Sequence, residues 1–333
     1  MRDVSSVAEG ARRALPDTDR LLVVLSDLMG RRGLPPPVRI LQRHTNEYAS
    51  TFPSETIDCE CRDGAVRRIH AKFQAGREHG DHGHRRDLTY EGAVYEELVC
   101  PVGLPMPGWV GAHHDDAGDV WLFIEHVEGA VELDEAPRPE DALLAASRWI
   151  GTFHAWHDRS GGGAGSVALT RYDAPYYSGW ISRTREFAGP WKTRLPWLAE
   201  VSRRSEVLLR ELHGVTPTVI HGEFTPSNAL IVDGVVHPID WESAALAPGE
   251  IDIVCLIDKW PLAVSDACIA AYTAARWPEG PPAGAARRVD LARVYWDFRW
   301  LGDRPEWTGS EKVGPRFEHL REAVERLSEA TRS

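Results

Sequence analysis

Two polar clusters follow apolar strand patterns in the second half of the chain. The first covers 221–228 and the second covers 240–242. Side chains at strand ends emerge from a rigid scaffold into a cleft, where functional groups are commonly held. Glu223 supplies a carboxylate that can accept a proton. Asn228 and Asp240 supply hard oxygen atoms, the ligands that Mg²⁺ prefers, and the hairpin pattern between them allows both to converge on one ion.

A lysine and a glutamate in the first third of the chain complement these clusters. Lys72 lies on an alternating strand pattern, and Glu91 begins a helix pattern further along. A strand lysine paired with a glutamate of the following helix is the device that holds nucleotide phosphates in kinases. Phosphoryl transfer depends mainly on positioning and charge neutralisation. A lysine, a candidate base and two metal-ligand residues are therefore nearly sufficient for it.

The elements that must position these residues fall into two groups along the chain. The first third is rich in strand patterns, and the rest is mainly helical with short hairpins. This order predicts an α+β protein of two lobes and not the regular alternation of a doubly wound sheet. The expected elements are a helical lead-in over 1–34, strands over 57–61, 65–73, 120–125 and 217–221, helices over 90–98 and from about 139, and a hairpin over 229–240.

Charge and composition exclude several classes of protein. The 333 residues carry 38 Lys and Arg against 50 Asp and Glu, a formal net charge of −12. Duplex nucleic-acid binding needs a basic surface, whereas this acidity is compatible with a cationic small molecule. No apolar run reaches the about 20 residues of a spanning helix or the about 7–15 of a signal sequence. The five scattered cysteines predict reduced thiols in a cytoplasmic protein with no membrane partner. Cys59 and Cys61 share one face of a strand pattern and are expected in the core.

The stretch VIHGEFTPSNALIVDGVVHPIDWE, at 219–242, resembles the aminoglycoside phosphotransferase and choline kinase-like family. The family pattern is His-Gly-Asp, four residues, Asn, a hairpin, and an Asp followed by a second acid. The resemblance spans about 40 to 260 and implies a bilobal protein-kinase-like fold. Its N-terminal lobe would cover 1–124, a hinge 125–129, and a helical C-terminal lobe 130–333. Four more segments occur in the family's order: RIHAKF, YEGAVYEEL, LFIEHVEG and WIGTFHAWH.

The resemblance implies where the nucleotide, ATP or GTP, would bind. Lys72 would hold its phosphates with support from Glu91. The backbone C=O of Glu125 and N–H of Val127 would bind adenine. The loop over 45–54, expected to cover the phosphates, lacks glycine and is therefore less permissive than a glycine loop. Its hydroxyl side chains, among them Ser50 and Thr51, would donate hydrogen bonds to the phosphates instead.

The resemblance also implies the catalytic roles. His221 would orient the catalytic segment, Asn228 and Asp240 would bind Mg²⁺, and Asp252 would tie down local backbone. Glu223 stands where the family has its catalytic aspartate. The extra methylene moves the carboxylate by about 1.5 Å, and a misplacement of that order can cost about 100-fold in rate. We expect a working base in a reshaped pocket, and a weak or non-standard kinase is the alternative.

Several other residues leave more than one interpretation open. Glu242 is either a second metal ligand or a surface acid. His79, His82 and His84 lie in a Gly-rich loop that is solvated, acts as a lid, or binds a metal. His154 and His157 are expected in the core. Tyr172, Tyr176, Tyr177, Trp180 and Trp191 either line a cage for a cation or pack normally, and the candidates for the acceptor pocket are Trp296, Asp297 and Trp300.

These patterns predict an enzyme, a Mg²⁺-dependent phosphotransferase with an alcohol group as acceptor. The acceptor would be an aminoglycoside-like compound, another natural product, an amino alcohol or a sugar. Two alternatives remain: a nucleotide-binding pseudokinase with a regulatory role, and a kinase-like enzyme that transfers a nucleotidyl group. The sequence leaves the acceptor, the choice of nucleotide and the oligomeric state open.

Overall fold

The computed structural model describes residues 14–47, 51–77, 84–161 and 167–330. They fall into two compact units. Unit 1 lies within Met1–Ala142, Gly165–Val167 and Pro226–Ser243, and unit 2 lies within Leu143–Ala164, Ala168–Thr225 and Ala244–Ser333. The segment Pro226–Ser243 therefore belongs to unit 1, although the chain before and after it belongs to unit 2. The lobe boundaries expected from the sequence, with a hinge at 125–129, stay a prediction.

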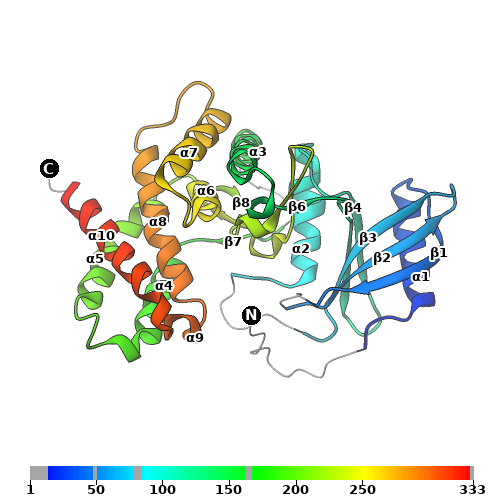
Figure 1. Ribbon diagram of the computed structural model, residues 1–333, viewed down its shortest axis with the longest axis horizontal. Helices are drawn as coiled ribbons and strands as arrows, with labels where there is room; N and C mark the ends of the chain where they lie inside the picture. The colour runs from blue at the N-terminus through cyan, green and yellow to red at the C-terminus, as the bar shows by residue number, and fades with distance from the viewer. Residues whose placement is uncertain (1–13, 48–50, 78–83, 162–166, 331–333) are drawn as a thin grey trace. The chain divides into compact units, whose positions relative to one another are not determined.

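A five-stranded antiparallel sheet forms the centre of unit 1 (Figure 1). The expected hairpin is present, and it turns at Asp63 and Gly64, where glycine takes a φ of +80°. The two outer strands were not expected from the sequence. In sheet order the strands are β1 (Pro37–Thr45), β2 (Ser54–Cys61), β3 (Val66–Phe73), β5 (Val120–Glu125) and β4 (Trp109–His114).

The two faces of this sheet have different partners. Helix α1 (Thr18–Arg31) packs on the face that carries Ile69, Ala71 and Phe73, all buried. Because side chains alternate along a strand, Lys72 points to the other face. The helix expected over 90–98 consists of α2 (Leu88–Val94) and a π-helical turn, η1 (Tyr95–Val99). It packs against β4 and β5 and brings its N-terminal turn to the Lys72 side.

The core role expected for the cysteines is confirmed for the strand pair. Cys59 and Cys61 lie on one face of β2, 0% and 2% exposed, and both are free thiols. Burial raises the pKa of Cys59 to about 12. Because the thiolate is the reactive form, this cysteine is chemically inert at neutral pH.

The rest of unit 1 is built on the expected hairpin. Strands β9 (Ala229–Val232) and β10 (Val235–Pro238) turn at Asp233 and Gly234, and β6 (Val131–Glu132) pairs with β9. Short helical turns stand on both sides of this hairpin, η5 (Pro226–Asn228) before it and η6 (Trp241–Ser243) after it. Two more 3₁₀ turns in this unit are η2 (Cys100–Val102) and η3 (Leu133–Glu135).

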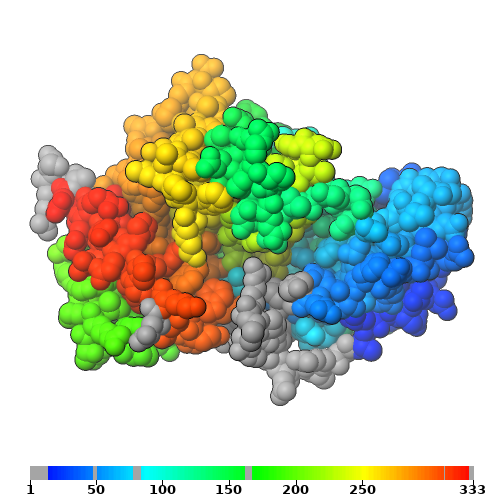
Figure 2. Space-filling model, in the orientation of Figure 1, coloured from blue at the N-terminus to red at the C-terminus, as the bar shows by residue number. Residues whose placement is uncertain are grey.

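Unit 2 is mainly helical, as expected, and confirms the α+β class. Helix α8 (Ala285–Leu301) lies at its centre and packs against α4 (Ala174–Phe187), α5 (Leu198–His213), α6 (Glu250–Ile257) and α10 (Gly314–Ala330). Figure 2 shows α5 and α10, in green and red, packed together at the surface of this unit. None of the helices in the described ranges is long and apolar enough to cross a membrane.

The remaining elements of unit 2 are short, apart from two helices. Helix α3 begins in unit 1 and continues through unit 2, where His154 and His157 are buried as expected. A small sheet has the order β7-β11-β8. The bounds are α3 (Pro139–Arg159), α7 (Leu262–Arg276), α9 (Pro305–Thr308), β7 (Thr170–Arg171), β8 (Thr218–Ile220), β11 (Ala245–Ala247), η4 (Gly189–Trp191) and η7 (Glu311–Val313).

A close approach between α3 and α7 generates the first prediction. A Cβ atom at Gly151 would lie 2.7 Å from the carbonyl oxygen of Tyr272 and 3.0 Å from the Cβ of Ala275. Because a backbone carbonyl cannot swing aside, Gly151→Ala forces the two helices apart. We expect a loss of about 1–3 kcal/mol in the free energy of unfolding, measured by urea denaturation.

Gly179→Ala is the matched control. Gly179 lies on α4, and a Cβ atom there meets no atom within 4 Å. Alanine is favoured over glycine in a helix by about 0.5–1 kcal/mol, so this variant should be as stable as the wild type or more so. Equal stability of Gly151→Ala and the wild type would contradict the close approach.

Candidate functional site

The ammonium group of Lys72 binds two carboxylates in unit 1. Its Nζ donates to both carboxylate oxygens of Glu91, at 2.9 and 3.0 Å, and to Oδ1 of Asp240 at 2.5 Å. Lys72 lies on β3 and Glu91 on α2, and Asp240 is the second residue after the end of β10. Three segments far apart in the sequence thus meet at one nitrogen atom. The pairing of Lys72 with Glu91 expected from the sequence is present.

The two carboxylates differ in exposure. The side chain of Glu91 is 0% exposed, that of Lys72 16%, and that of Asp240 31%. Burial lowers the pKa of Lys72, but Asp240 and Glu91 oppose it and hold this pKa well above its usual value. Burial raises the pKa of Glu91, and the attraction of Lys72 opposes that shift. Glu91 is therefore an internal support for the lysine, whereas Asp240 is the carboxylate that a ligand can reach.

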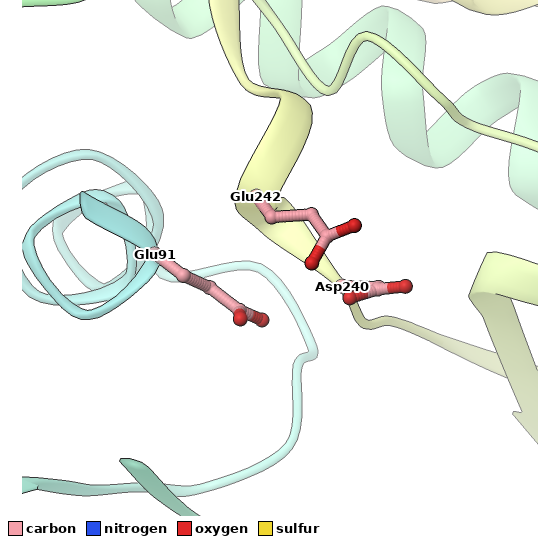
Figure 3. A group of neighbouring side chains, drawn as sticks. All are labelled: Glu91, Asp240 and Glu242. Atoms are coloured by element: carbon pink, nitrogen blue, oxygen red, sulfur yellow. The ribbon is translucent and has the colours of Figure 1, made fainter. Parts of the chain in front are cut away.

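A third carboxylate belongs to the same group. Oxygen atoms of Glu91, Asp240 and Glu242 lie within 4.8 Å of one another, and Figure 3 shows these side chains converging from α2 and from the end of the hairpin. Glu242 is 6% exposed, so it is not the surface acid of the second interpretation. Its carbonyl accepts from the N–H of Arg86 at 2.9 Å, and its Oε1 lies 3.5 Å from Nε of Arg85.

Asn228 and Asp240 stand at the same end of the β9–β10 hairpin. The carbonyl of Asn228 accepts a hydrogen bond at 2.9 Å from the N–H of Ile239, the residue before Asp240. Asp240 has a φ of 69°, a left-handed conformation that Asp and Asn tolerate better than most residues. The backbone thus brings the two residues to the same end of the hairpin, and their convergence on one metal ion stays a prediction.

The donor atoms around Lys72 fit a hard divalent cation. Three carboxylates, the Lys72 ammonium and the Arg85 guanidinium beside Glu242 leave a net charge of −3 + 2 = −1 when all are ionised. Carboxylate and amide oxygens are the ligands of Mg²⁺ and Ca²⁺. The partly exposed Asp240, the neighbouring Glu242 and Asn228 are the residues that can hold such an ion.

The segments expected around the nucleotide are described in part. Strand β5 ends at Glu125, whose N–H donates to the carbonyl of Gly108 at 2.7 Å, and the carbonyl of Val127 accepts from the N–H of Ala130 at 3.3 Å. These two hydrogen bonds use the N–H of Glu125 and the C=O of Val127. The groups expected to bind adenine are the opposite ones, the C=O of Glu125 and the N–H of Val127. The carbonyl of Thr51 accepts from Arg77 at 3.2 Å. Ser50, His79 and His82 lie outside the described residues, and His84 is buried, 4% exposed.

Asp252 anchors the catalytic segment in unit 2. Its Oδ2 accepts from the N–H of His221 at 2.7 Å, and its Oδ1 accepts from the N–H of Gly222 at 2.9 Å. Nε2 of His154 lies 3.1 Å from the same Oδ2, and Nδ1 lies 3.1 Å from the hydroxyl of Tyr272. Burial lowers the pKa of His154. The expectation that Asp252 ties down backbone is confirmed, and His154 is part of that anchor.

Glu223 is paired with an arginine that sequence reasoning missed. Nη2 of Arg299 on α8 donates to Oε1 of Glu223, and Nη1 lies 3.3 Å from Oδ1 of Asp303. The side chains of Arg299 and Asp303 are each 4% exposed, and that of Glu223 is 11% exposed. No sequence motif marks Arg299 as a site residue, and it lies 76 residues after its partner Glu223. The only signal was its position among Trp296, Asp297 and Trp300.

The three acceptor-pocket candidates on α8 have partners within unit 2. Asp297 binds Arg316 at 3.0 Å and His319 at 2.8 Å on α10, because it points to the opposite side of the helix from Arg299. Trp300 stacks on Trp307 with ring centroids 5.5 Å apart. Trp296 is 6% exposed and lies under the Arg299 guanidinium. A role in acceptor binding stays a prediction for these residues.

The aromatic set expected near the acceptor packs together in the core of unit 2. Tyr172 stacks on Tyr176 at 3.9 Å, and the hydroxyl of Tyr176 lies 3.3 Å from that of Tyr295. Trp180 is 3% exposed. The ring face of Trp180 already carries the guanidinium of Arg299 at 4.9 Å. Arg183 lies over the same ring at 6.0 Å, so the cations at Trp180 are ones that the protein supplies itself.

Comparison with known proteins places the chain among phosphotransferases. The model of the phosphotransferase enzyme family matches residues 77–287. No curated protein sequence matches the chain. Similar solved structures include choline kinase LicA from Streptococcus pneumoniae, with 12% identity, a TM-score of 0.56, and coverage of 93% of this chain and 99% of that one.

Two further structures have the same fold. The GDP complex of aminoglycoside 2'-phosphotransferase-IIIa is 14% identical, with a TM-score of 0.59 and coverage of 93% of this chain and 99% of that one. Amicoumacin kinase hAmiN, in complex with AMP-PNP and Ca²⁺, is 12% identical, with a TM-score of 0.59 and coverage of 94% and 96%. At these identities the likeness establishes the fold, which is the bilobal protein-kinase-like fold expected from the sequence.

The anchor of the catalytic segment generates the second prediction. In Asp252→Asn one carboxylate oxygen becomes an NH₂ group, which meets a backbone N–H instead of accepting from it. A buried donor left unsatisfied costs about 1–3 kcal/mol. We expect Asp252→Asn to lose about that much free energy of unfolding in urea denaturation.

Asp290→Asn is the control for this prediction. Asp290 is 50% exposed and binds only the neighbouring Arg293 among the contacts described, at 3.2 Å. Surface pairs of this kind contribute about 0–1 kcal/mol, so this variant should unfold within about 0.5 kcal/mol of the wild type. If Asp252→Asn and Asp290→Asn have the same free energy of unfolding, the hydrogen bonds of Asp252 do not stabilise the fold.

Proposed function

The chain belongs to the phosphotransferase enzyme family and is a small-molecule phosphotransferase with an alcohol group as acceptor; on that premise we propose that it transfers the γ-phosphoryl group of ATP or GTP, with Mg²⁺, to a natural-product, amino-alcohol or sugar hydroxyl. The observation that carries this proposal is the Lys72 ammonium held between Glu91 and Asp240. The family model begins at residue 77, so Lys72 lies outside the matched range. Lys72 is therefore an observation outside the match, and it binds two carboxylates that the matched range contains.

Lys72 would hold the nucleotide phosphates in the proposed reaction. A lysine acts on phosphate as a point charge, so its position matters more than its orientation. Glu91, fully buried and bound through both oxygens, keeps the ammonium in place. The phosphate would approach from the side of Asp240, the more exposed partner. Glu125 and Val127 would bind the base through their backbone groups, and Ser50 and Thr51 would contact the phosphates.

Asp240 and Asn228 would hold the metal ion, with Glu242 as a further ligand. A Mg²⁺ ion held by these residues would supply positive charge that offsets the charge developing on the phosphoryl group. The chain's own contribution is the placement of three carboxylate groups within 4.8 Å. Ca²⁺ stands with AMP-PNP in the related kinase hAmiN, which supports the use of a divalent cation here.

Glu223 would accept the hydrogen bond of the acceptor hydroxyl and take its proton as transfer proceeds. The hydroxyl oxygen forms a bond to the γ-phosphorus, and the bond from that phosphorus to the bridging oxygen of the leaving nucleotide diphosphate breaks. His221 would orient the segment through its N–H, which is anchored on Asp252 at 2.7 Å. Because the transition state is loose, a positioned carboxylate can act without being a strong base.

Removal of the proposed metal ligand generates the third prediction. Asp240→Ala should abolish Mg²⁺-dependent ATP turnover, a loss of at least about 100-fold in rate. Asp240 is partly exposed, so its truncation opens no core cavity, and the fold should remain intact by circular dichroism. Turnover would be measured as release of labelled phosphate from γ-labelled ATP.

Asp233→Asn is the control on the same hairpin. Asp233 sits at the exposed turn with a φ of 51°, a conformation that Asn also adopts. This variant should keep wild-type turnover. Retained turnover in Asp240→Ala, with Asp233→Asn unchanged, would contradict the metal assignment.

The acceptor would be identified by a screen of hydroxylated amines, sugars and antibiotics with γ-labelled ATP and GTP. Transfer of label to one class names the substrate, and the ratio of the two nucleotides names the donor. Mass spectrometry of the product separates phosphoryl transfer, which adds about 80 Da, from nucleotidyl transfer, which adds about 329 Da with ATP. Binding of Mg-ATP without turnover on any acceptor or on water would favour a pseudokinase.

A further inference from the structure

We propose that Arg299 is a positioning residue for the reaction: it holds the carboxylate of Glu223 at a set place and thereby accommodates glutamate where an aspartate is expected. This inference rests on the proposed function, since Glu223 acts there on the acceptor hydroxyl. All the residues involved belong to unit 2.

The guanidinium of Arg299 is fixed from several directions. It lies over the ring of Trp180 at 4.9 Å and over that of Trp296 at 5.7 Å. Trp296 is one helical turn before Arg299 on α8, so its ring stays beside the arginine. Nη1 lies 3.3 Å from Asp303, one turn later on the chain. The arginine is 4% exposed and therefore has little freedom to follow a partner that moves.

The planar guanidinium offers N–H groups in a rigid fork, so it can bind two carboxylates at once. Glu223 accepts at Nη2, and Oδ1 of Asp303 lies 3.3 Å from Nη1. Asp303 has a second cation in Arg304 at 4.0 Å, and burial of an unpaired carboxylate would be unfavourable. The pairing of Glu223 thus depends on the guanidinium position that the two tryptophans and Asp303 set.

The length of the acid at 223 must match that position. Aspartate is shorter by one methylene, which withdraws the carboxylate by about 1.5 Å. A hydrogen bond to the fixed guanidinium does not survive a withdrawal of that size. Glu223 and Arg299 therefore act as a matched pair, and the glutamate is the residue that this pocket requires. An aspartate at this position would leave the cation without one of its two partners.

The cation also determines the chemistry of the acid. The Arg299 guanidinium donates to Oε1 of Glu223, and a neighbouring positive charge favours the ionised form of a carboxylate. Glu223 accepts the hydrogen bond of the hydroxyl and orients its oxygen toward the phosphorus. The proton passes to the carboxylate as the new oxygen–phosphorus bond forms, and leaves to water after the product separates. Arg299 acts through Glu223 and needs no contact with the reacting atoms.

The test is the pH dependence of Mg-ATP hydrolysis with water as the acceptor probe. Arg299→Met removes the positive charge that favours the ionised carboxylate, so the acid limb of its kcat profile should move to higher pH by about 1 unit or more. Arg299→Lys keeps the charge without the two-pronged geometry, so its limb should stay near that of the wild type while kcat falls. An unmoved limb in Arg299→Met would overturn the inference.

Glu223→Asp tests the length match. We expect its kcat to fall by about 100-fold while the KM for ATP, which depends on Lys72 and Asp240, stays unchanged. Activity equal to or above the wild type would overturn the inference, because the pocket would then accept the shorter acid. This variant and Arg299→Lys are conservative, so they carry the test if Arg299→Met does not fold.

Arg288→Met is the matched control. Arg288 lies on the same helix, binds the buried carboxylate of Glu250 at 2.7 Å and stacks over Trp277 at 6.0 Å. It should lower the melting temperature as Arg299→Met does and leave the acid limb in place. An equal shift of the limb in Arg288→Met would show a general loss of stability and not a role at Glu223.

Failure of the proposed function gives a different result. If the wild type shows neither a thermal shift with Mg-ATP nor any hydrolysis, the proposed function fails and the positioning role fails with it. If the wild type binds and hydrolyses Mg-ATP, but the Arg299 and Glu223 variants have the same kcat and the same acid limb of the pH profile as the wild type, only the role of Arg299 fails. A double-mutant cycle of Glu223→Gln and Arg299→Met on urea unfolding measures the pair without activity, and a coupling near zero would also overturn it.

Discussion

A charge taken out of water must be compensated by a partner at hydrogen-bond distance, and this requirement governs both functional regions of the protein. In unit 1 the compensated cation is Lys72, shared by Glu91 and Asp240. In unit 2 it is Arg299, shared by Glu223 and Asp303. In each case one basic group serves two acids. The arrangement holds in place Asp240 and Glu223, the two carboxylates that we propose act in the reaction.

The surrounding elements are explained by this requirement. Strand β3 supplies Lys72 from the face of the sheet opposite α1, and the first turn of α2 brings Glu91 to it. The hairpin β9–β10 returns to the same place with Asp240, and the close backbone contact at Asn228 sets its end. In unit 2 the central position of α8 allows a single helix to present Arg299 on one side and Asp297 on the other.

Sequence patterns predicted those parts in which local chemistry decides the structure. The β2–β3 hairpin, the Glu91 helix and the β9–β10 hairpin follow from alternation and turn residues such as Asp63 and Gly64. Strands β1 and β4 were missed because they lie at the edges of the sheet. β1 is mostly exposed, so it shows no apolar alternation. The Lys72–Asp240 contact was not expected either, because it joins residues 168 apart.

The contact between Arg299 and Glu223 was also not predicted from the sequence. An arginine on a helix is normally a surface residue, and nothing in its neighbours indicates that its partner lies 76 residues earlier. The burial of the guanidinium depends on the rings of Trp180 and Trp296, which come from different helices. Such a contact is a property of tertiary packing, and it becomes visible only when the helices are assembled.

The course of the chain through the two units has a consequence for synthesis. Unit 1 is discontinuous, since its last segment, Pro226–Ser243, follows a long stretch that belongs to unit 2. The sheet and α2 leave the ribosome early, but the partner that Lys72 finds in Asp240 is translated much later. Contacts of such large sequence separation form slowly. Lys72 therefore cannot gain its contact with Asp240 until the hairpin over Pro226–Ser243 has been translated.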